Sequence, residues 1–271
     1  MGIRDIIKAV ESKDPDKLKA QLGPMAEGES STSLPFEPYC KRCGDTGWIP
    51  APPREANGTT YTFDTPCPCK EAKRMRRIAE QSGLKAAMDV MTLNTFVQDA
   101  PFRKAMHEKA VSFLESQGSE WLYIGGQPGS GKTHICTAVC VELMEKGIPV
   151  KYMLWTDESL RIVSSRTDSE EQEALLEPLK SVPVLYIDDL FKGEVDREKR
   201  LNPSPASQKL AFEILNARYS RNLRTIISGE WNLEQLLDID QATFSRVYQK
   251  CTDKYRMYIA PGKEKNWRLR T

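Results

Sequence analysis

One stretch decides the fold: Gly126-Gln127-Pro128-Gly129-Ser130-Gly131-Lys132-Thr133, which fits G-x-x-x-x-G-K-[ST]. Its glycines let the backbone wrap closely round a phosphate, and the helix that begins here adds its positive dipole end. Lys132 can reach the β- and γ-phosphates of ATP, and the Thr133 hydroxyl can ligate magnesium. The alternative is a glycine-rich turn before a lysine. The apolar run Trp121–Ile124 before the loop and an apolar helix after it favour the nucleotide site.

A second motif is the apolar run Val182–Ile187, which ends in Asp188 and Asp189. In a doubly wound sheet, the carboxyl end of such a strand lies beside the phosphate loop. We therefore expect Asp188 to hold magnesium together with Thr133, and Asp189 to polarise the attacking water. The alternative is an ordinary surface turn after a core strand.

Helices and strands are predicted to alternate from Phe102 onward. The helices are expected at 102–117, 132–146, 157–180 and 206–221, and the strands at 121–124, 149–155, 182–187 and 224–228. This order is typical of an α/β fold, with a parallel sheet flanked by helices. We predict an ATPase domain at 102–271 after a linker at 83–101. A small helical and cysteine-containing domain at 1–82 precedes it, with its own linker at about 23–38.

Four of the seven cysteines are grouped in two close pairs near the N-terminus. Between the pairs, a hairpin is predicted in which Gly47-Trp48-Ile49 faces Tyr61-Thr62-Phe63. Tetrahedral zinc takes four thiolates from two such turns. The alternative is a set of unligated cysteines in a segment with little core of its own. We predict a zinc site made by Cys40, Cys43, Cys67 and Cys69.

Cys136 and Cys140 lie four residues apart on the helix after the phosphate loop. Small apolar side chains there pack against a sheet, so core packing is the better prediction for both.

The formal charge of +1 on 271 residues gives no global case for binding nucleic acid. Two local patches remain. Lys73–Arg77 is basic, but a solvated helix face is the ordinary explanation for it. The stretch 157–180 carries Arg161, Arg166 and Lys180 together with Glu170, Glu171, Glu173 and Glu177, a balance that is more typical of a solvated helix than of a DNA groove. No apolar run is long enough to span a bilayer, and Met1–Asp5 does not read as a signal peptide. We expect a cytoplasmic protein.

With these motifs placed, the chain resembles the DnaC/DnaI helicase loaders, an AAA+ family that includes the IstB transposition helpers. The likeness covers most of Phe102–Ile259. It rests on the phosphate loop followed by His134 and on four later stretches, Val184–Asp189, Phe212–Tyr219, Thr225–Ser228 and Thr243–Arg246. The N-terminal cysteines are similar to those of the DnaI branch and its phage-encoded relatives.

The resemblance implies an AAA+ P-loop ATPase in which hydrolysis acts as a conformational switch. It implies self-association into a ring or spiral that engages a hexameric replicative helicase of the DnaB/DnaC type. The N-terminal part would bind that helicase, and the assembly would help place it on single-stranded DNA. Arg246 would be the arginine finger that reaches the γ-phosphate in the neighbouring subunit, with a salt-bridged surface arginine as the alternative.

Two positions depart from the family pattern. Many relatives carry Ser-Asn or Thr-Asn where this chain has Ser228-Gly229-Glu230. Glu230 is the candidate to orient water there, although its carboxylate would repel a γ-phosphate. The second departure is that the family's second sensor arginine has no clear match in the C-terminal part, where Arg268 is the one candidate. Two other functions stay open: an IstB-like transposition helper, and a zinc-containing DNA-binding regulator in which ATP is structural.

Overall fold

The computed structural model describes residues 43–44, 46–51, 53–56, 59–67, 70, 82–88, 90–165 and 168–269. The chain divides into two compact units, Met1–Thr65 and Pro66–Thr271. The predicted linker at 23–38, the basic patch Lys73–Arg77 and two of the four N-terminal cysteines lie outside the described residues. Within the described ranges, no helix combines the length and the apolar character needed to cross a membrane.

The predicted hairpin is present, but its register differs. Strand β1 (Trp48–Pro50) pairs with β4 (Asp64–Pro66), and β2 (Arg54–Ala56) pairs antiparallel with β3 (Thr59–Tyr61). Tyr61 therefore lies opposite Arg54 and not opposite Trp48. The reason is that β2 and β3 take up residues that the sequence pattern assigns to the loop.

The larger unit is built on a five-stranded parallel sheet in the order β6-β7-β8-β5-β9. The strands are β5 (Trp121–Gly126), β6 (Val150–Leu154), β7 (Val184–Leu190), β8 (Arg224–Gly229) and β9 (Arg256–Ile259). The predicted α/β fold with a parallel sheet is confirmed. Strand β9 is an addition, because the sequence pattern predicts no strand beyond β8.

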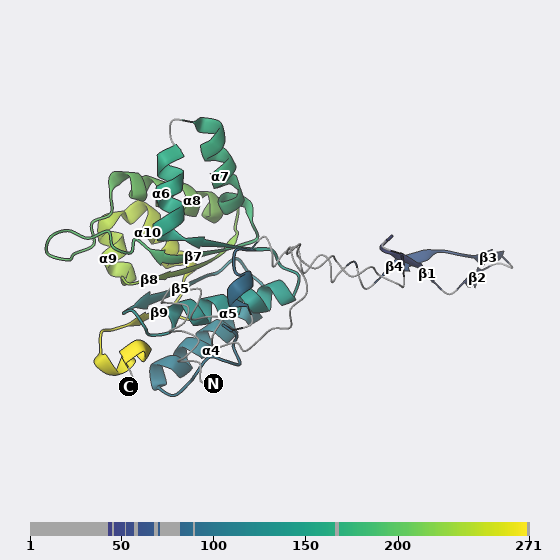
Figure 1. The fold of residues 1–271 in the computed structure, drawn as a ribbon, viewed down its shortest axis with the longest axis horizontal. Coiled ribbons are helices and arrows are strands. Elements are labelled where there is room, and N and C mark those ends of the chain that lie inside the picture. The colour runs from purple at the N-terminus through teal and green to yellow at the C-terminus, as the bar shows by residue number, and fades with distance from the viewer. Residues whose placement is uncertain are drawn as a thin grey trace, which may run out of the picture. The chain divides into compact units, whose positions relative to one another are not determined.

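Helices cover both faces of this sheet (Figure 1). Side chains alternate along a strand, so Leu122 and Ile124 enter one apolar core while Trp121 and Tyr123 enter the other. The first core is closed by α4 (Pro101–Glu115) and α5 (Lys132–Glu145). The second is closed by α6 (Trp155–Ser164), α7 (Ser169–Ser181), α8 (Pro205–Ser220), α9 (Leu233–Ile239) and α10 (Gln241–Lys250).

Residues 83–101, predicted as a linker, contribute to the first core. Leu84 and Phe96 are buried, and η1 (Lys85–Ala87) lies between them. An exposed linker would not bury these side chains. Their irregular spacing is the reason that the sequence pattern does not predict the burial. The boundary between the two predicted domains stays a prediction.

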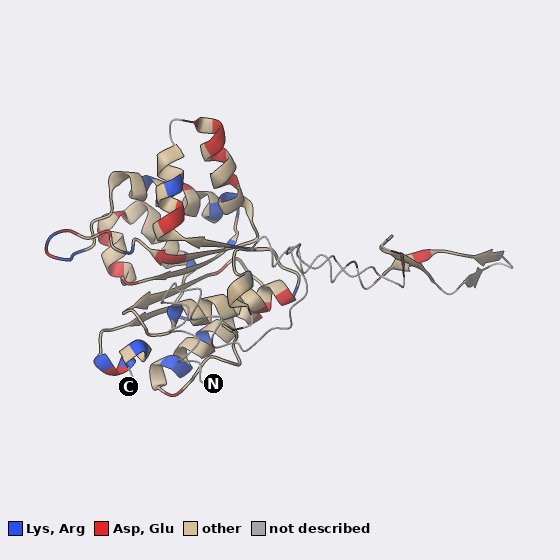
Figure 2. Cartoon of the chain, viewed as in Figure 1, with Lys and Arg blue, Asp and Glu red and all other residues tan. Residues whose placement is uncertain are grey.

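The predicted helical stretch 157–180 is two helices, α6 and α7. Acidic residues make up much of α7 (Figure 2). Lys180, one of the basic residues of this stretch, is buried and pairs with Glu213 at 2.7 Å and Glu173 at 3.4 Å. These ion pairs occupy its ammonium group, and whether the stretch contacts DNA stays a prediction.

Core packing is confirmed for Cys136 and Cys140, which are fully buried on α5. Burial raises the pKa of both thiols above the ordinary range, so they stay neutral. Cys251, which follows α10, is also buried.

Candidate nucleotide-binding site

The predicted phosphate loop lies between β5 and α5. Gly126, Gly129 and Gly131 have φ of 129°, 75° and 100°, values that side chains other than glycine rarely adopt. At Gly126 a Cβ atom would also lie 2.3 Å from the carbonyl oxygen of Ile259. The loop ends where α5 begins at Lys132. The first N–H groups of that helix have no partner within the helix, and together with its dipole they form an anion site.

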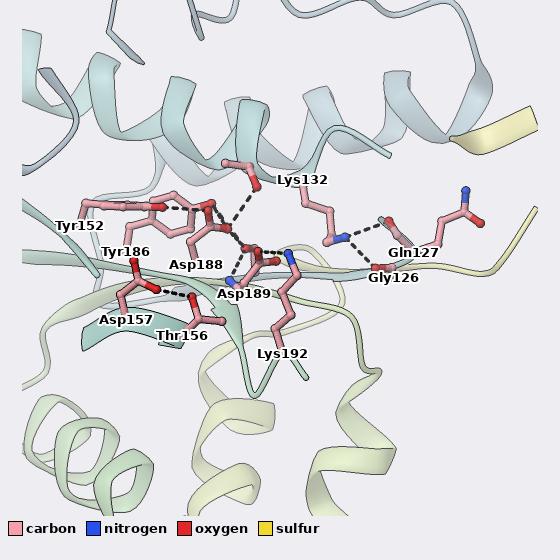
Figure 3. Close-up of polar contacts among 12 residues, drawn as sticks. Gly126, Gln127, Lys132, Tyr152, Thr156, Asp157, Tyr186, Asp188, Asp189 and Lys192 are labelled. Carbon is pink, nitrogen blue, oxygen red and sulfur yellow. Dashed lines mark hydrogen bonds and ion pairs between the residues drawn. The ribbon is translucent and has the colours of Figure 1, made fainter. Parts of the chain in front are cut away.

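Lys132 points into this loop (Figure 3). Its Nζ donates to the carbonyl oxygens of Gly126 at 2.7 Å and Gln127 at 2.9 Å, and its side chain is buried. Burial lowers the pKa of Lys132, while the nearby charges of Asp189 and Glu230 act in the opposite direction. The ammonium group of Lys132 is therefore held at the loop by two neutral carbonyl acceptors, which bind it less strongly than a charged acceptor would.

Asp188, at the carboxyl end of β7, is only 2% exposed and accepts hydrogen bonds from four hydroxyl groups (Figure 3). The four donors come from four different elements, and Tyr186 lies on β7, the strand that also carries Asp188. The donors are Thr133 at 3.2 Å, Tyr186 at 2.7 Å, Tyr152 at 3.1 Å and Ser228 at a shorter distance. The contact with Thr133 brings together the two oxygen groups predicted to hold magnesium. An alcohol and a carboxylate are donors that suit this hard cation.

A β-bulge sets the direction of the next carboxylate, Asp189. Ile187 pairs with Ile227, and Leu190 pairs with Gly229, so β7 carries one extra residue between these pairs. Asp189 sits in this bulge with φ of 58° and donates its backbone N–H to Ser228 Oγ at 3.2 Å. The bulge therefore turns the Asp189 side chain away from that of Asp188.

The Asp189 carboxylate pairs with Lys192, whose Nζ lies 2.6 Å from Oδ2 (Figure 3). Lys192 begins a charged loop that leads to α8, and its side chain is 44% exposed, so it can move aside at small cost. The Asp189 side chain is 18% exposed, which leaves it accessible to a water molecule.

The structure places the other predicted site residues as follows. Glu230 follows β8, and its charge reaches Lys132. Arg246 lies on α10, where it donates to Ala242 O and its guanidinium carbon is 5.7 Å from the ring centre of Tyr219. In the described part of the chain these contacts keep Arg246 on its own helix and α8. The loop, Asp188, Asp189 and Glu230 are thus brought together, and Arg246 is not.

Three residues of the site are missing from the sequence prediction: Tyr152, Tyr186 and Ser228 as donors to Asp188. Tyr186 could have been found, because residues two apart on a strand share a face. Ser228 stands at a family position, but its contact depends on the pairing of β7 with β8. Tyr152 gives no signal, since its approach depends on the order of β6 and β7 in the sheet.

The zinc prediction is not tested here, because Cys40 and Cys69 lie outside the described residues. Cys43 and Cys67 both stand at turns: Cys43 O accepts from Thr46 N at 3.2 Å, and Cys67 O accepts from Lys70 N at 2.9 Å. Over the described ranges, no group of three or more His, Cys, Asp and Glu side chains is arranged to hold a metal.

Comparison with known families agrees with the geometry. The family model described as "IstB-like ATP binding protein" matches residues 66–246, more than half of the chain.

Three relatives come from Bacillus subtilis strain 168. YqaM, an uncharacterized protein, is 29% identical over 74% of this chain and 65% of its own length. XkdC of the phage-like element PBSX is 27% identical over 94% of this chain and 95% of its own length. The replicative helicase loader DnaI is 26% identical over 63% of this chain and 55% of its own length. The chain thus spans less than two thirds of YqaM and of DnaI.

Among solved structures, domain III of the Thermotoga maritima replication initiation protein DnaA superposes with a TM-score of 0.52. It is 20% identical, and the match covers 65% of this chain and 69% of that one. At this identity the likeness supports the AAA+ fold alone.

Proposed function

Because the chain belongs to the family of IstB-like ATP-binding proteins, we propose that it is an ATP-dependent loader of a replicative helicase. The chain would bind the hexameric helicase and help to place it on single-stranded DNA. The contact of Thr133 with Asp188 carries the nucleotide part, because it joins the loop to the carboxylate strand. The relationship to DnaI, a replicative helicase loader, supports the choice of partner.

In this proposal the residues of the loop bind the phosphates of ATP. The N–H groups at the start of α5 surround them, and Lys132 exchanges its two carbonyl acceptors for phosphate oxygens. Thr133 and Asp188 hold magnesium, which neutralises the charge that develops on the phosphates.

Asp189 orients the attacking water and accepts its proton, once Lys192 moves aside. The hydroxyl of Ser228 keeps Asp188 and Asp189 in their separate directions. Glu230 is the candidate to position the water from the other side. Before ATP binds, the negative charge of Glu230 favours the protonated form of Lys132. Once ATP is bound, the same charge opposes the γ-phosphate.

Arg246 is proposed to act on the nucleotide of a neighbouring copy. It extends from α10, and its described contacts are with Ala242 and Tyr219 rather than with its own phosphate loop. A cation placed at the γ-phosphate from a second subunit would make hydrolysis depend on self-association.

The zinc site is proposed from the spacing of Cys40, Cys43, Cys67 and Cys69. Metal analysis of the purified full chain tests it. We expect one equivalent of zinc per chain, reduced when Cys43 and Cys67 are both changed to serine. The matched control changes Cys136 and Cys140, which are buried in the ATPase core. A metal-free chain that binds its partner normally would contradict the proposal.

A second candidate function is the IstB-like transposition helper, since the family description itself carries that name. It needs the same ATP site but a transposase in place of a helicase. The four N-terminal cysteines favour the loader, because the resemblance places such a module in the DnaI branch.

The experiment that tests the loader function is co-purification of the chain with the replicative helicase of its own organism, with and without ATP. We expect a complex whose amount depends on the nucleotide and on Lys132. The matched control is Lys209→Ala, an exposed lysine on α8. The absence of any helicase complex, with and without ATP, would refute the loader and favour the second candidate.

A further inference from the structure

The segment after β9 is fastened across the phosphate loop. The backbone N–H of Gln127 donates to Ile259 O at 3.3 Å, and its side chain bonds both polar groups of Gly262. Nε2 donates to Gly262 O at 2.8 Å, and Oε1 accepts from Gly262 N at 2.6 Å. Further along, Trp267 N donates to Gly129 O at 2.9 Å. We call residues 259–269, which begin with the last residue of β9, the C-terminal strap.

The strap also fits the loop by shape. A Cβ atom at Gly129 would lie 2.0 Å from Asn266 Oδ1, so the two segments are in direct contact. Asn266 Oδ1 accepts from the N–H of Arg268 at 3.0 Å, which holds this turn of the strap. At its far end, the Trp267 ring lies over the guanidinium of Arg103, with 4.6 Å from its carbon to the ring centre. The strap is therefore anchored both on the loop and on α4.

The groups that the strap uses are not those that receive phosphate. It takes the N–H and side chain of Gln127 and the carbonyl of Gly129. The N–H groups at the start of α5, which form the anion site, are left for the ligand. The strap can thus stay in place while a nucleotide is bound.

A free glycine-rich loop must lose conformational freedom when it closes on a phosphate. Resting on the nucleotide site proposed above, we propose that Gln127 is a positioning residue that fastens the strap and so holds the loop in its phosphate-receiving shape. This gives a role to a loop position that the G-x-x-x-x-G-K-[ST] pattern leaves open.

The test measures binding of a fluorescent ATP analogue, together with steady-state turnover, in the full chain. Gln127→Ala removes both side-chain bonds to Gly262. We expect the dissociation constant and KM to rise by about 10-fold, as two lost hydrogen bonds imply, with kcat unchanged. The matched control is Gln208→Ala. Gln208 lies on α8, and its side chain donates a hydrogen bond to the backbone carbonyl of Pro203 at 2.9 Å, which the substitution removes.

A variant on the strap provides an independent readout. Trp267→Ala removes the stacking on Arg103 but keeps the backbone N–H that reaches Gly129. It should also weaken binding, and the double variant should lose less than the product of the two single effects, because both act by releasing one strap. If Gln127→Ala fails to fold, the Trp267→Ala variant alone still tests the proposal.

Three results would overturn the inference: unchanged affinity in both single variants, a fall in kcat at constant KM, or effects that multiply fully in the double variant. Lys132→Ala sets the baseline for lost binding. If the unchanged chain binds the analogue no better than Lys132→Ala, the nucleotide site itself fails rather than the strap.

Discussion

The hydroxyl of Ser228 donates to Asp188 Oδ1 and accepts the backbone N–H of Asp189 across the bulge at the end of β7. One side chain of β8 therefore holds both carboxylate positions of the nucleotide site. Ser228 is fully buried, so water cannot replace it easily.

Ser228→Ala should therefore affect both stability and turnover. It leaves the N–H of Asp189 without its acceptor, which costs about 1–3 kcal/mol of unfolding free energy. Turnover should fall because Asp189 is no longer held in its direction, and urea unfolding with a turnover assay checks both. Ser164→Ala, which removes an exposed hydroxyl bonded to Leu160 O, is the control. Unchanged turnover would remove Ser228 from the site.

A second prediction concerns Arg218, which is fully buried and has no carboxylate partner among the described residues. Its guanidinium joins the ends of α7 and β8 by donating to three carbonyl oxygens and one hydroxyl, those of Leu179, Val182, Arg224 and Thr225. Arg218→Met would leave these acceptors buried and unpaired, so we expect a loss of about 3–5 kcal/mol in urea unfolding.

The control for Arg218 is Arg221→Met on the same helix end. Arg221 pairs with Glu177 at 2.9 Å, with both side chains about half exposed, so its loss should lower the free energy of unfolding far less than the loss of Arg218. Equal losses in the two variants would contradict a structural role for the burial of Arg218.

The sequence alone predicts the parts of the site that depend on local order. The phosphate loop is continuous in the chain, and Asp188 follows an unbroken apolar strand. Strand β9 is different, because Arg256–Ile259 has only four residues and becomes a strand by pairing with β5, far away in the sequence. The partners Tyr152 and Ser228 also require the order of the strands, which composition and periodicity do not contain.

The strap shows the same limit. No helix or strand is predicted for it from the sequence, yet Gln127 and Gly262 meet because β9 lies beside β5 and brings the following residues to the loop. Residues 83–101 likewise lack the regular spacing from which burial can be inferred, although Leu84 and Phe96 enter the core.

A third prediction concerns pH and Lys132. Burial lowers the pKa of this lysine, so the unfolded chain binds more protons between the folded and the ordinary value. Its burial therefore costs stability below the folded pKa, and that cost disappears as the pH rises toward the ordinary value. ATP binds the protonated form, so affinity should fall with rising pH before an ordinary lysine titrates.

Glu230→Gln should move that fall in affinity to lower pH, because it removes a charge that favours the protonated lysine. Binding titrations across the alkaline range check this, with Lys132→Arg as the control whose charge persists. A pH profile that is the same in the glutamine variant would show that Glu230 does not act on Lys132.

A fourth prediction tests Arg246 across subunits. Arg246→Ala and Asp189→Asn should each lose turnover by at least about 100-fold while ATP binding is kept. A mixture should recover part of the activity, because an Asp189→Asn subunit can supply its arginine to the intact carboxylate of an Arg246→Ala neighbour. Arg200→Ala, an exposed arginine paired with Asp196, is the control. Failure of the mixture to recover activity would place Arg246 outside the shared site.

The decisive test of the proposed nucleotide site is magnesium-dependent ATP binding and turnover by the Lys132→Ala variant. If the site is correct, we expect ATP binding to be lost or turnover to fall by at least about 100-fold, with the melting temperature preserved and with Lys209→Ala behaving like the unchanged chain. ATP binding and turnover that persist at the unchanged level in a folded Lys132→Ala chain would contradict it.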